Sequence, residues 1–260
     1  MRKWLAAMLL VAALPAKAAI WTDLWWNPAE SGWGVTVTQQ YTAIFLTFFV
    51  YDASGAAHWY TASVFQGAKP ASGYPTWTGD MYETRGPYYG GAFNPANVQV
   101  RKVGTATFAP KTPSTATLQY SIDGVNVTKA IERQTFRHMP LGGVYLGFWR
   151  VGASTCAGVT PGDFGTIGLV NSDSPNNDGT GALLSTISLN AEPACGLASV
   201  YKQYGSIYAT TGVAACSSVA AGQLRFADLS PTDEGLGGNI VITPQNGCTI
   251  GLTFTSTRMQ

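Results

Sequence analysis

Charged side chains are scarce in this 260-residue sequence. Asp, Glu, Lys and Arg account for 11% of the residues and the formal net charge is +1, whereas soluble domains usually carry about 25% charged residues. Binding to nucleic acid or to an anionic membrane surface relies on clustered positive charge. The composition therefore argues against both partners, and we expect no nucleic acid to bind.

Residues suited to nucleophilic or metal chemistry are also few. The only histidines are His58 and His138, and the chain contains no Gly-x-Ser-x-Gly and no Cys-x-x-Cys motif. A working general base also needs an orienting partner. We predict that His58 faces outward from a strand and that His138 lies in a linker, with no catalytic residue, no metal and no cofactor.

Residues 171–179 (NSDSPNNDG) partly resemble a calcium loop. The order of oxygen ligands in such a loop is broken here, and no Glu follows at the twelfth position. We therefore predict a solvated turn rich in Asn, Asp and Pro. If calcium binds anywhere, Asp173 and Asp178 are the first ligands to test.

The N-terminus has the pattern of a secretory signal. Arg2 and Lys3 provide a positive start, residues 5–14 form an apolar run, and residues 16–18 (AKA) match the small-x-small cleavage pattern. The run is shorter than the roughly 20 residues that span a bilayer. We predict cleavage near Ala18 and export to the periplasm or the medium, with no integral membrane segment in the mature chain.

Cysteine is absent from the first 155 residues, and all four cysteines lie in the last 105. An even number of cysteines in an exported chain indicates two disulfides. Three connectivities are open. Our working hypothesis pairs Cys156 with Cys248 and Cys195 with Cys216.

Glycine and aromatic residues are abundant. The chain has 30 glycines and 12% aromatic residues, a composition that favours many short strands joined by turns. Residues 34–40 (GVTVTQQ) alternate with period two, whereas residues 43–51 (AIFLTFFVY) are almost continuously apolar, as in a central strand covered on both faces. Asp123-Gly124 is a strong hairpin signal. We predict an all-β fold, with a short helix only at residues 230–236.

The pattern divides the chain into two units after the signal at residues 1–18. We predict an antiparallel up-and-down meander, barrel-like and rich in aromatic residues, over residues 20–136. A disulfide-stapled β domain is expected over residues 140–260. The boundary falls at residues 135–143 (TFRHMPLGG), where a strand-rich segment ends and a Pro and a Gly pair intervene.

A set of spaced motifs runs through the first unit. They are residues 25–34 (WWNPxESGWG), 51–60 (YDxxGxxxWY), 86–87 (GP), 103–104 (VG), 120–125 (YxxDGV) and 129–134 (KxIxRQ). Together they resemble an uncharacterised β module found in exported proteins of proteobacteria, for which no activity is established. The resemblance implies a bacterial secreted module and nothing catalytic. The short opening Trp-Trp-Asn is also similar to the start of biotin-binding avidin-type barrels.

The aromatic residues carry the main functional signal. Adjacent Trp25 and Trp26 point to opposite faces of an extended stretch, so at least one of them can reach solvent or cover a barrel mouth. Trp33 and Trp59 are expected to pack in the core, since a strand aromatic usually buries its ring. The predicted ligand-binding residues are Trp25, Trp26, Asn27, Glu30, Tyr88 and Tyr89.

Three functions remain open from the sequence. The leading hypothesis is an exported, non-catalytic binding or surface-interaction protein that holds a carbohydrate or a small apolar ligand at the aromatic cluster or the barrel mouth. The first alternative is a secreted, glycosidase-like hydrolase, with Asp23 and Glu30 as its acid pair. The second is a structural protein of the envelope or the extracellular space.

Overall fold

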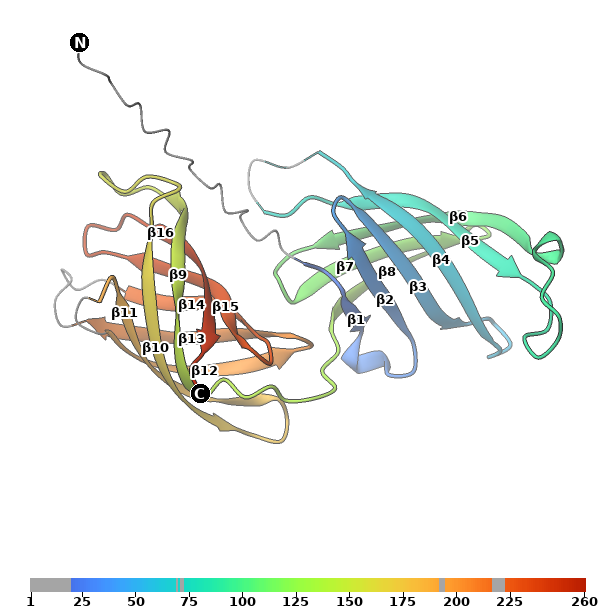
Figure 1. Cartoon of the computed structure of the whole chain (residues 1–260). Helices are drawn as coiled ribbons and strands as arrows, with labels where there is room; N and C mark the ends of the chain where they lie inside the picture. The colour runs from blue at the N-terminus through green and yellow to red at the C-terminus, as the bar shows by residue number, and fades with distance from the viewer. Residues whose placement is uncertain (1–19, 69, 71–72, 192–194, 217–222) are drawn as a thin grey trace, which may run out of the picture.

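The computed structural model describes residues 20–68, 70, 73–191, 195–216 and 223–260. The predicted signal at residues 1–18 lies outside these ranges. Figure 1 shows two β-barrels side by side, the first coloured blue to green and the second yellow-green to red. No helix among the described residues is long and apolar enough to cross a membrane.

Each barrel is a closed antiparallel meander of eight strands. The first closes where β1 (Asp23–Trp26) pairs with β8 (Val125–Arg133), and the second closes where β9 (Gly143–Ser154) pairs with β16 (Ile250–Arg258). The all-β prediction and the meander prediction are thereby confirmed. Closure leaves neither sheet with a free edge.

The remaining elements follow chain order. In the first barrel they are β2 (Gly34–Gln40), β3 (Ala43–Tyr51), β4 (Ala57–Gln66), β5 (Trp77–Arg85), β6 (Gln99–Pro110) and β7 (Thr115–Ile122), with 3-10 turns η1 (Pro28–Glu30) and η2 (Pro95–Asn97). In the second they are β10 (Phe164–Pro175), β11 (Thr180–Leu189), β12 (Cys195–Tyr204), β13 (Ile207–Cys216), β14 (Gln223–Pro231) and β15 (Gly235–Thr243).

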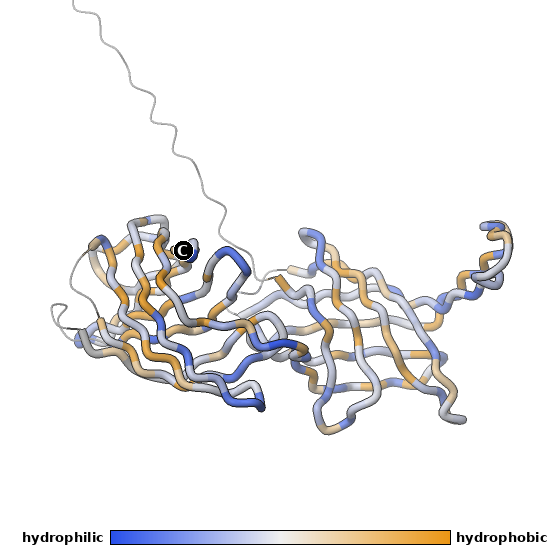
Figure 2. Tube along the Cα trace, turned by 60° about the horizontal axis from the view of Figure 1, so that its bottom comes forward, coloured by the Kyte–Doolittle hydropathy of each residue, from blue (hydrophilic) through white to orange (hydrophobic). Residues whose placement is uncertain are grey.

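The barrel interiors are filled by alternate residues of each strand. In β2, Val35 and Val37 are fully buried, and their register neighbours on β3 are Phe48 and Leu46, which are also buried. Figure 2 shows apolar positions recurring along the strands of both barrels. This arrangement follows from the period-two geometry of a strand, in which successive side chains point to opposite faces.

The predicted hairpin at Asp123-Gly124 is present between β7 and β8. Both residues have positive φ (48° and 86°), and Ile122 pairs with Val125 across the turn. A two-residue loop with both φ angles positive matches the right-handed twist of the flanking strands. Asn or Asp followed by Gly reaches this conformation at low cost, which is why the signal could be read from sequence.

The cysteine prediction is supported where the structure describes it. Cys156 and Cys248 form a disulfide that bridges 92 residues of the second barrel. Cys195 is also disulfide-bonded, and it lies directly opposite Cys216 in the register of β12 and β13. The side chain of Cys216 lies outside the described part of the chain.

Two local predictions for the second barrel are wrong. Residues 230–236 form the hairpin between β14 and β15 instead of a helix, because Gly235 and Leu236 pair with β16. The segment 171–179 is not a single solvated turn, since its first five residues extend β10. Asp173 points inward, where it accepts hydrogen bonds from the backbone N of Leu141 (2.9 Å) and the hydroxyl of Tyr201 (2.6 Å).

The carboxylate of Asp23 connects the two barrels. Arg133, only 3% exposed, pairs with Asp23 (3.1 Å) at the base of the first barrel and lies over the ring of Trp25. Asp23 Oδ2 also accepts hydrogen bonds from the backbone N (3.1 Å) and Oγ (3.3 Å) of Ser206, in the β12–β13 turn. The carboxylate of Asp23 therefore bonds to residues of both barrels.

Candidate functional site

The predicted tryptophan pair is split between core and surface, as its alternation requires. Trp25 is fully buried, and its Nε1 donates to the carbonyl of Trp21 (3.0 Å). Trp26, its neighbour on β1, is partly exposed and lies opposite Glu132 of β8. Trp25 therefore presents no surface to a ligand, whereas Trp26 lies on the outer wall of the barrel.

Asn27 and Glu30 hold the turn that follows β1. The side-chain oxygen of Asn27 caps η1 by accepting from the backbone N of Ala29 (3.0 Å). Glu30 accepts hydrogen bonds from Trp33 Nε1 (3.0 Å) and Lys129 Nζ (2.7 Å), and the bond from Lys129 lowers the pKa of the Glu30 carboxyl. These contacts fasten η1 across the end of the barrel.

Tyr88 and Tyr89 lie in the long loop between β5 and β6, which projects from the end of the first barrel (Figure 1). Both residues are exposed, Tyr89 to 92%, and their ring centroids are 4.8 Å apart. The two rings are therefore open to solvent, but they are not joined to Trp25 in one cluster, and their role in ligand binding stays a prediction.

Asp23 and Glu30, the acid pair of the hydrolase alternative, do not lie together. Asp23 begins β1 and is held by Arg133 and Ser206, whereas Glu30 follows the far end of β1 and is held by Lys129. Each carboxylate has its own cationic partner. No group of three or more His, Cys, Asp or Glu residues suited to a metal ion occurs within the described residues.

The predicted orientations of His58 and Trp59 are reversed. His58 shares the inner face of β4 with Tyr60, onto which it stacks (6.1 Å between centroids), and it contacts Asp52 (3.0 Å). Trp59 therefore points outward and is 51% exposed. The phase of β4 is set by Tyr60, Ala62 and Val64, which are all buried, and a one-residue shift would move every one of them to the surface.

Trp59 belongs to an exposed aromatic face on the outside of β3 and β4. Its direct cross-strand neighbour is Phe49, and β3 adds further aromatic rings at alternate positions. Between 46% and 60% of each residue's surface is accessible. We call this set the aromatic face, and its members are Phe45, Phe49, Tyr51, Trp59 and Phe65.

Hydroxyl groups separate the rings of the aromatic face. Thr47 lies between Phe45 and Phe49 on β3 and pairs with Thr61 of β4, while Ser63 lies opposite Phe45. The hydroxyl of Tyr51 donates to the carbonyl of Gly32 (2.9 Å), which ties that ring to the turn before β2. The face therefore combines flat apolar rings with hydrogen-bonding groups.

The prediction for β3 is wrong about what covers its outer side. Residues 43–51 are apolar on both faces, so the sequence predicted a strand covered on both sides. In the structure Leu46 and Phe48 fill the barrel while Phe45 and Phe49 face outward with no element of the described chain packed over them.

A charged cluster joins β5, β6 and the β7–β8 turn of the first barrel. Glu83, 9% exposed, accepts from Arg85 (3.1 Å) and Arg101 (2.9 Å), and Arg101 also binds Asp123 through both guanidinium ends. The hydrogen bond from Arg101 lowers the pKa of Glu83 and that of Asp123. These charges neutralise one another, so the cluster braces strands β5 to β8.

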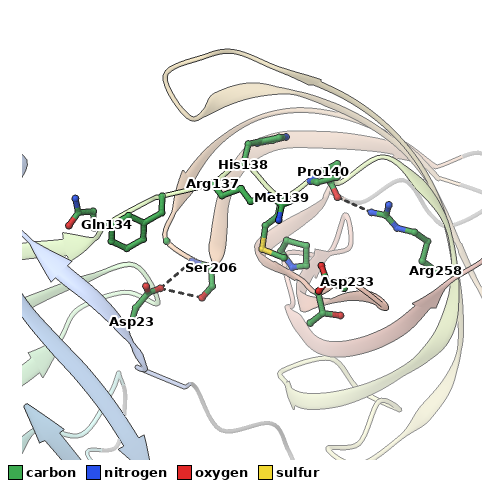
Figure 3. Close-up of a pocket in the computed structure, with 13 residues that line it drawn as sticks. Asp23, Gln134, Arg137, His138, Met139, Pro140, Ser206, Asp233 and Arg258 are labelled. Atoms are coloured by element: carbon green, nitrogen blue, oxygen red, sulfur yellow. Dashed lines mark hydrogen bonds between the residues drawn. The ribbon is translucent and has the colours of Figure 1, made fainter.

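A pocket of about 470 Å³ lies where the linker between the barrels meets the second barrel (Figure 3). His138 lies in that linker as predicted, and its Nδ1 is 3.2 Å from the hydroxyl of Tyr208. Burial raises the pKa of Tyr208 to about 12, so the phenol stays protonated and donates to the carbonyl of Met139 (2.6 Å). The network therefore fastens the linker over the barrel.

Comparisons with known proteins leave the family open. No protein-family model and no curated protein matches the chain. The resemblance to a proteobacterial exported module stays a prediction.

Proposed function

We propose that the protein is an exported, non-catalytic binding module whose aromatic face holds an extended, flat carbohydrate polymer. The single observation that carries the proposal is the row of exposed rings on β3 and β4, interleaved with threonine and serine hydroxyls. Contiguous exposed apolar surface on a soluble protein marks interaction sites.

The dimensions of the face favour an extended ligand. Phe45 and Tyr51 are six positions apart on one strand, which corresponds to roughly 20 Å at the usual rise per residue. Trp59 and Phe65 span the same length on β4 in the opposite direction. A stripe of this length is longer than one sugar ring, and each ring on it can stack on the apolar side of a different sugar.

The chemistry of the face favours carbohydrate over a purely apolar ligand. Aromatic rings offer a large apolar surface with little conformational entropy to lose, since they rotate about only two side-chain bonds. The hydroxyls of Thr47, Thr61 and Ser63 can both donate and accept, as sugar hydroxyls require. Charge is absent from the middle of the face, which suits a neutral polymer.

The proposal is tested by sedimentation binding to microcrystalline cellulose and to chitin. The Phe49→Ala, Trp59→Ala double variant should bind about 100-fold more weakly, since each lost ring contact is worth roughly 1.5 kcal/mol. Phe164→Ala, which removes an exposed ring from the second barrel, is the matched control and should bind like the wild type. A wild-type chain that sediments with neither polymer would refute the proposal.

Export is tested separately. The apolar run at residues 5–14 and the small-x-small pattern at residues 16–18 support cleavage near Ala18. A protein recovered from the periplasm or the medium should have a mass that corresponds to a chain beginning near residue 19. Retention of residues 1–18 on the recovered chain would contradict it.

A further inference from the structure

A second pocket, of about 410 Å³, lies between the base of the first barrel and the outer wall of the second. It adjoins the pocket of Figure 3, with which it shares Ser206, Pro231 and Thr232. Its volume falls within the range of roughly 300–1,000 Å³ that is typical of small-molecule sites. Its two walls differ in chemistry.

The wall from the second barrel carries a polar row across three strands. Asp228 of β14 pairs in register with Asn239 of β15, which pairs with Thr253 of β16. Asn239 Nδ2 donates to both oxygens of Asp228 (3.1 and 2.9 Å), and Thr253 Oγ1 donates to Asn239 Oδ1 (2.8 Å). The row holds the carboxylate in one orientation.

A β-bulge directs Asp228 to this wall. The register of β14 and β15 shifts between Phe226 and Asp228, and both Phe226 and Leu229 remain fully buried in the barrel. A bulge inserts a residue and turns a side chain to a new direction, and bulges are frequent beside functional sites. Asp228 is 9% exposed and lines the pocket.

The wall from the first barrel is aromatic. Tyr74 meets Trp21 edge-on, with 5.0 Å between their centroids, and Pro113 lies beside them. Burial, and then the negative charge of Asp228, raise the pKa of Tyr74, so its hydroxyl stays a hydrogen-bond donor. An apolar ring thus faces a carboxylate, an amide and hydroxyls across one pocket.

The local charge balance selects among ligands. Arg133 also lines the pocket. Burial lowers the pKa of its guanidinium, whereas the charges of Asp23 and, to a smaller extent, Asp228 act in the opposite direction. The site therefore already contains a guanidinium, and a ligand ammonium would be repelled by it. A neutral ligand rich in hydroxyls fits both walls better.

We propose that this pocket binds a soluble saccharide of one or two rings, with Asp228 and Asn239 bonded to neighbouring hydroxyls and Tyr74 against the apolar side of a ring. Asp228 accepts from a sugar hydroxyl, and Thr253 acts as a positioning residue through Asn239. The site is separate from the aromatic face and does not depend on it.

Isothermal titration calorimetry of the full chain tests the site with four probes: D-glucose, D-galactose, N-acetyl-D-glucosamine and maltose. At least one probe should bind the wild type. Asp228→Asn should weaken its binding about tenfold or more, because a neutral amide oxygen replaces the charged acceptor. Asp80→Asn is the matched control, since Asp80 is an exposed acid of β5 paired with Lys102, and its binding should be unchanged.

A second variant keeps the inference testable if Asp228→Asn fails to fold. Ser230 lines the pocket and is partly exposed, and its side chain forms no hydrogen bond within the described residues. Ser230→Trp should therefore fill the cavity and abolish binding in a chain that melts like the wild type. The Phe49→Ala, Trp59→Ala variant should bind the same probe as the wild type does. This result would distinguish loss of binding at the pocket from loss of binding at the aromatic face. Absence of heat with all four probes, or binding that survives both Asp228→Asn and Ser230→Trp, would overturn the inference.

Discussion

Arg133 Nη1 lies 3.1 Å from Asp23 Oδ2, and the same carboxylate oxygen is bonded to Ser206 of the other barrel. The two residues of the ion pair are 110 positions apart in the chain. Arg133 further donates to the carbonyls of Ile20 (2.6 Å) and Pro113 (2.9 Å). The guanidinium of Arg133 therefore contacts the segment before β1 and the β6–β7 turn. Through Asp23 it is also linked to the second barrel.

Removing Asp23 should destabilise the protein strongly. Asp23→Ala leaves the buried Arg133 without its carboxylate, and an unpaired buried charge costs about 3 kcal/mol or more. Urea unfolding at pH 7 measures the loss. Asp80→Ala, which breaks the exposed pair with Lys102, should cost less than about 1 kcal/mol. Equal losses in the two variants would contradict the role of Asp23.

A side chain at position 205 should loosen the contact between the barrels. Gly205 has φ +57°, and a Cβ there would collide with the carboxylate of Asp23 and press on Arg133. Gly205→Ala should therefore make residues 134–142 more susceptible to limited proteolysis than they are in the wild type. Gly55→Ala is the control, because its φ is +81° with no atom near the new Cβ. That variant carries only the backbone cost, about 1–2 kcal/mol, and should leave the linker protected.

Asp52 should contribute stability that disappears in acid. Hydrogen bonds from Ser54, then from the backbone of Ala56, hold the pKa of Asp52 far below its ordinary value of 3.8. A carboxyl with a lowered pKa in the folded state stabilises the protein above its unfolded pKa and loses that contribution as the pH falls. Asp52→Ala should thus lower the Tm at pH 7, and the difference from wild type should shrink steadily below about pH 3.8. A difference that grows in acid would contradict this assignment.

Reduction of the disulfide should weaken the second barrel. The bridge between Cys156 and Cys248 closes a loop of 92 residues, and the chain-entropy model assigns a loop of that size about 4–5 kcal/mol. The Cys156→Ala, Cys248→Ala variant should lower the unfolding midpoint of the second barrel in urea. Ser172→Ala, at an exposed position of β10, keeps both cysteines and serves as the control. An unchanged midpoint in the double variant would count against a stabilising disulfide.

The sequence by itself determined the strand content, the antiparallel meander and several turns. Period-two alternation in β2 and the Asp123-Gly124 signal are local, since they depend on backbone geometry within a few residues. The even number of cysteines indicated disulfides without any knowledge of the fold, because it depends only on composition. These features needed no knowledge of distant partners.

Only the tertiary structure decided which faces are covered. Residues 43–51 are apolar on both sides, so alternation could not tell the inner ring of Phe48 from the outer ring of Phe49. Asp23 was considered as a hydrolase acid and Asp173 as part of a solvated turn, because their partners lie far along the chain, at Arg133 and at Tyr201. Barrel closure and the contact between the barrels brought those groups together, and long-range pairing of this kind leaves no local pattern in the sequence.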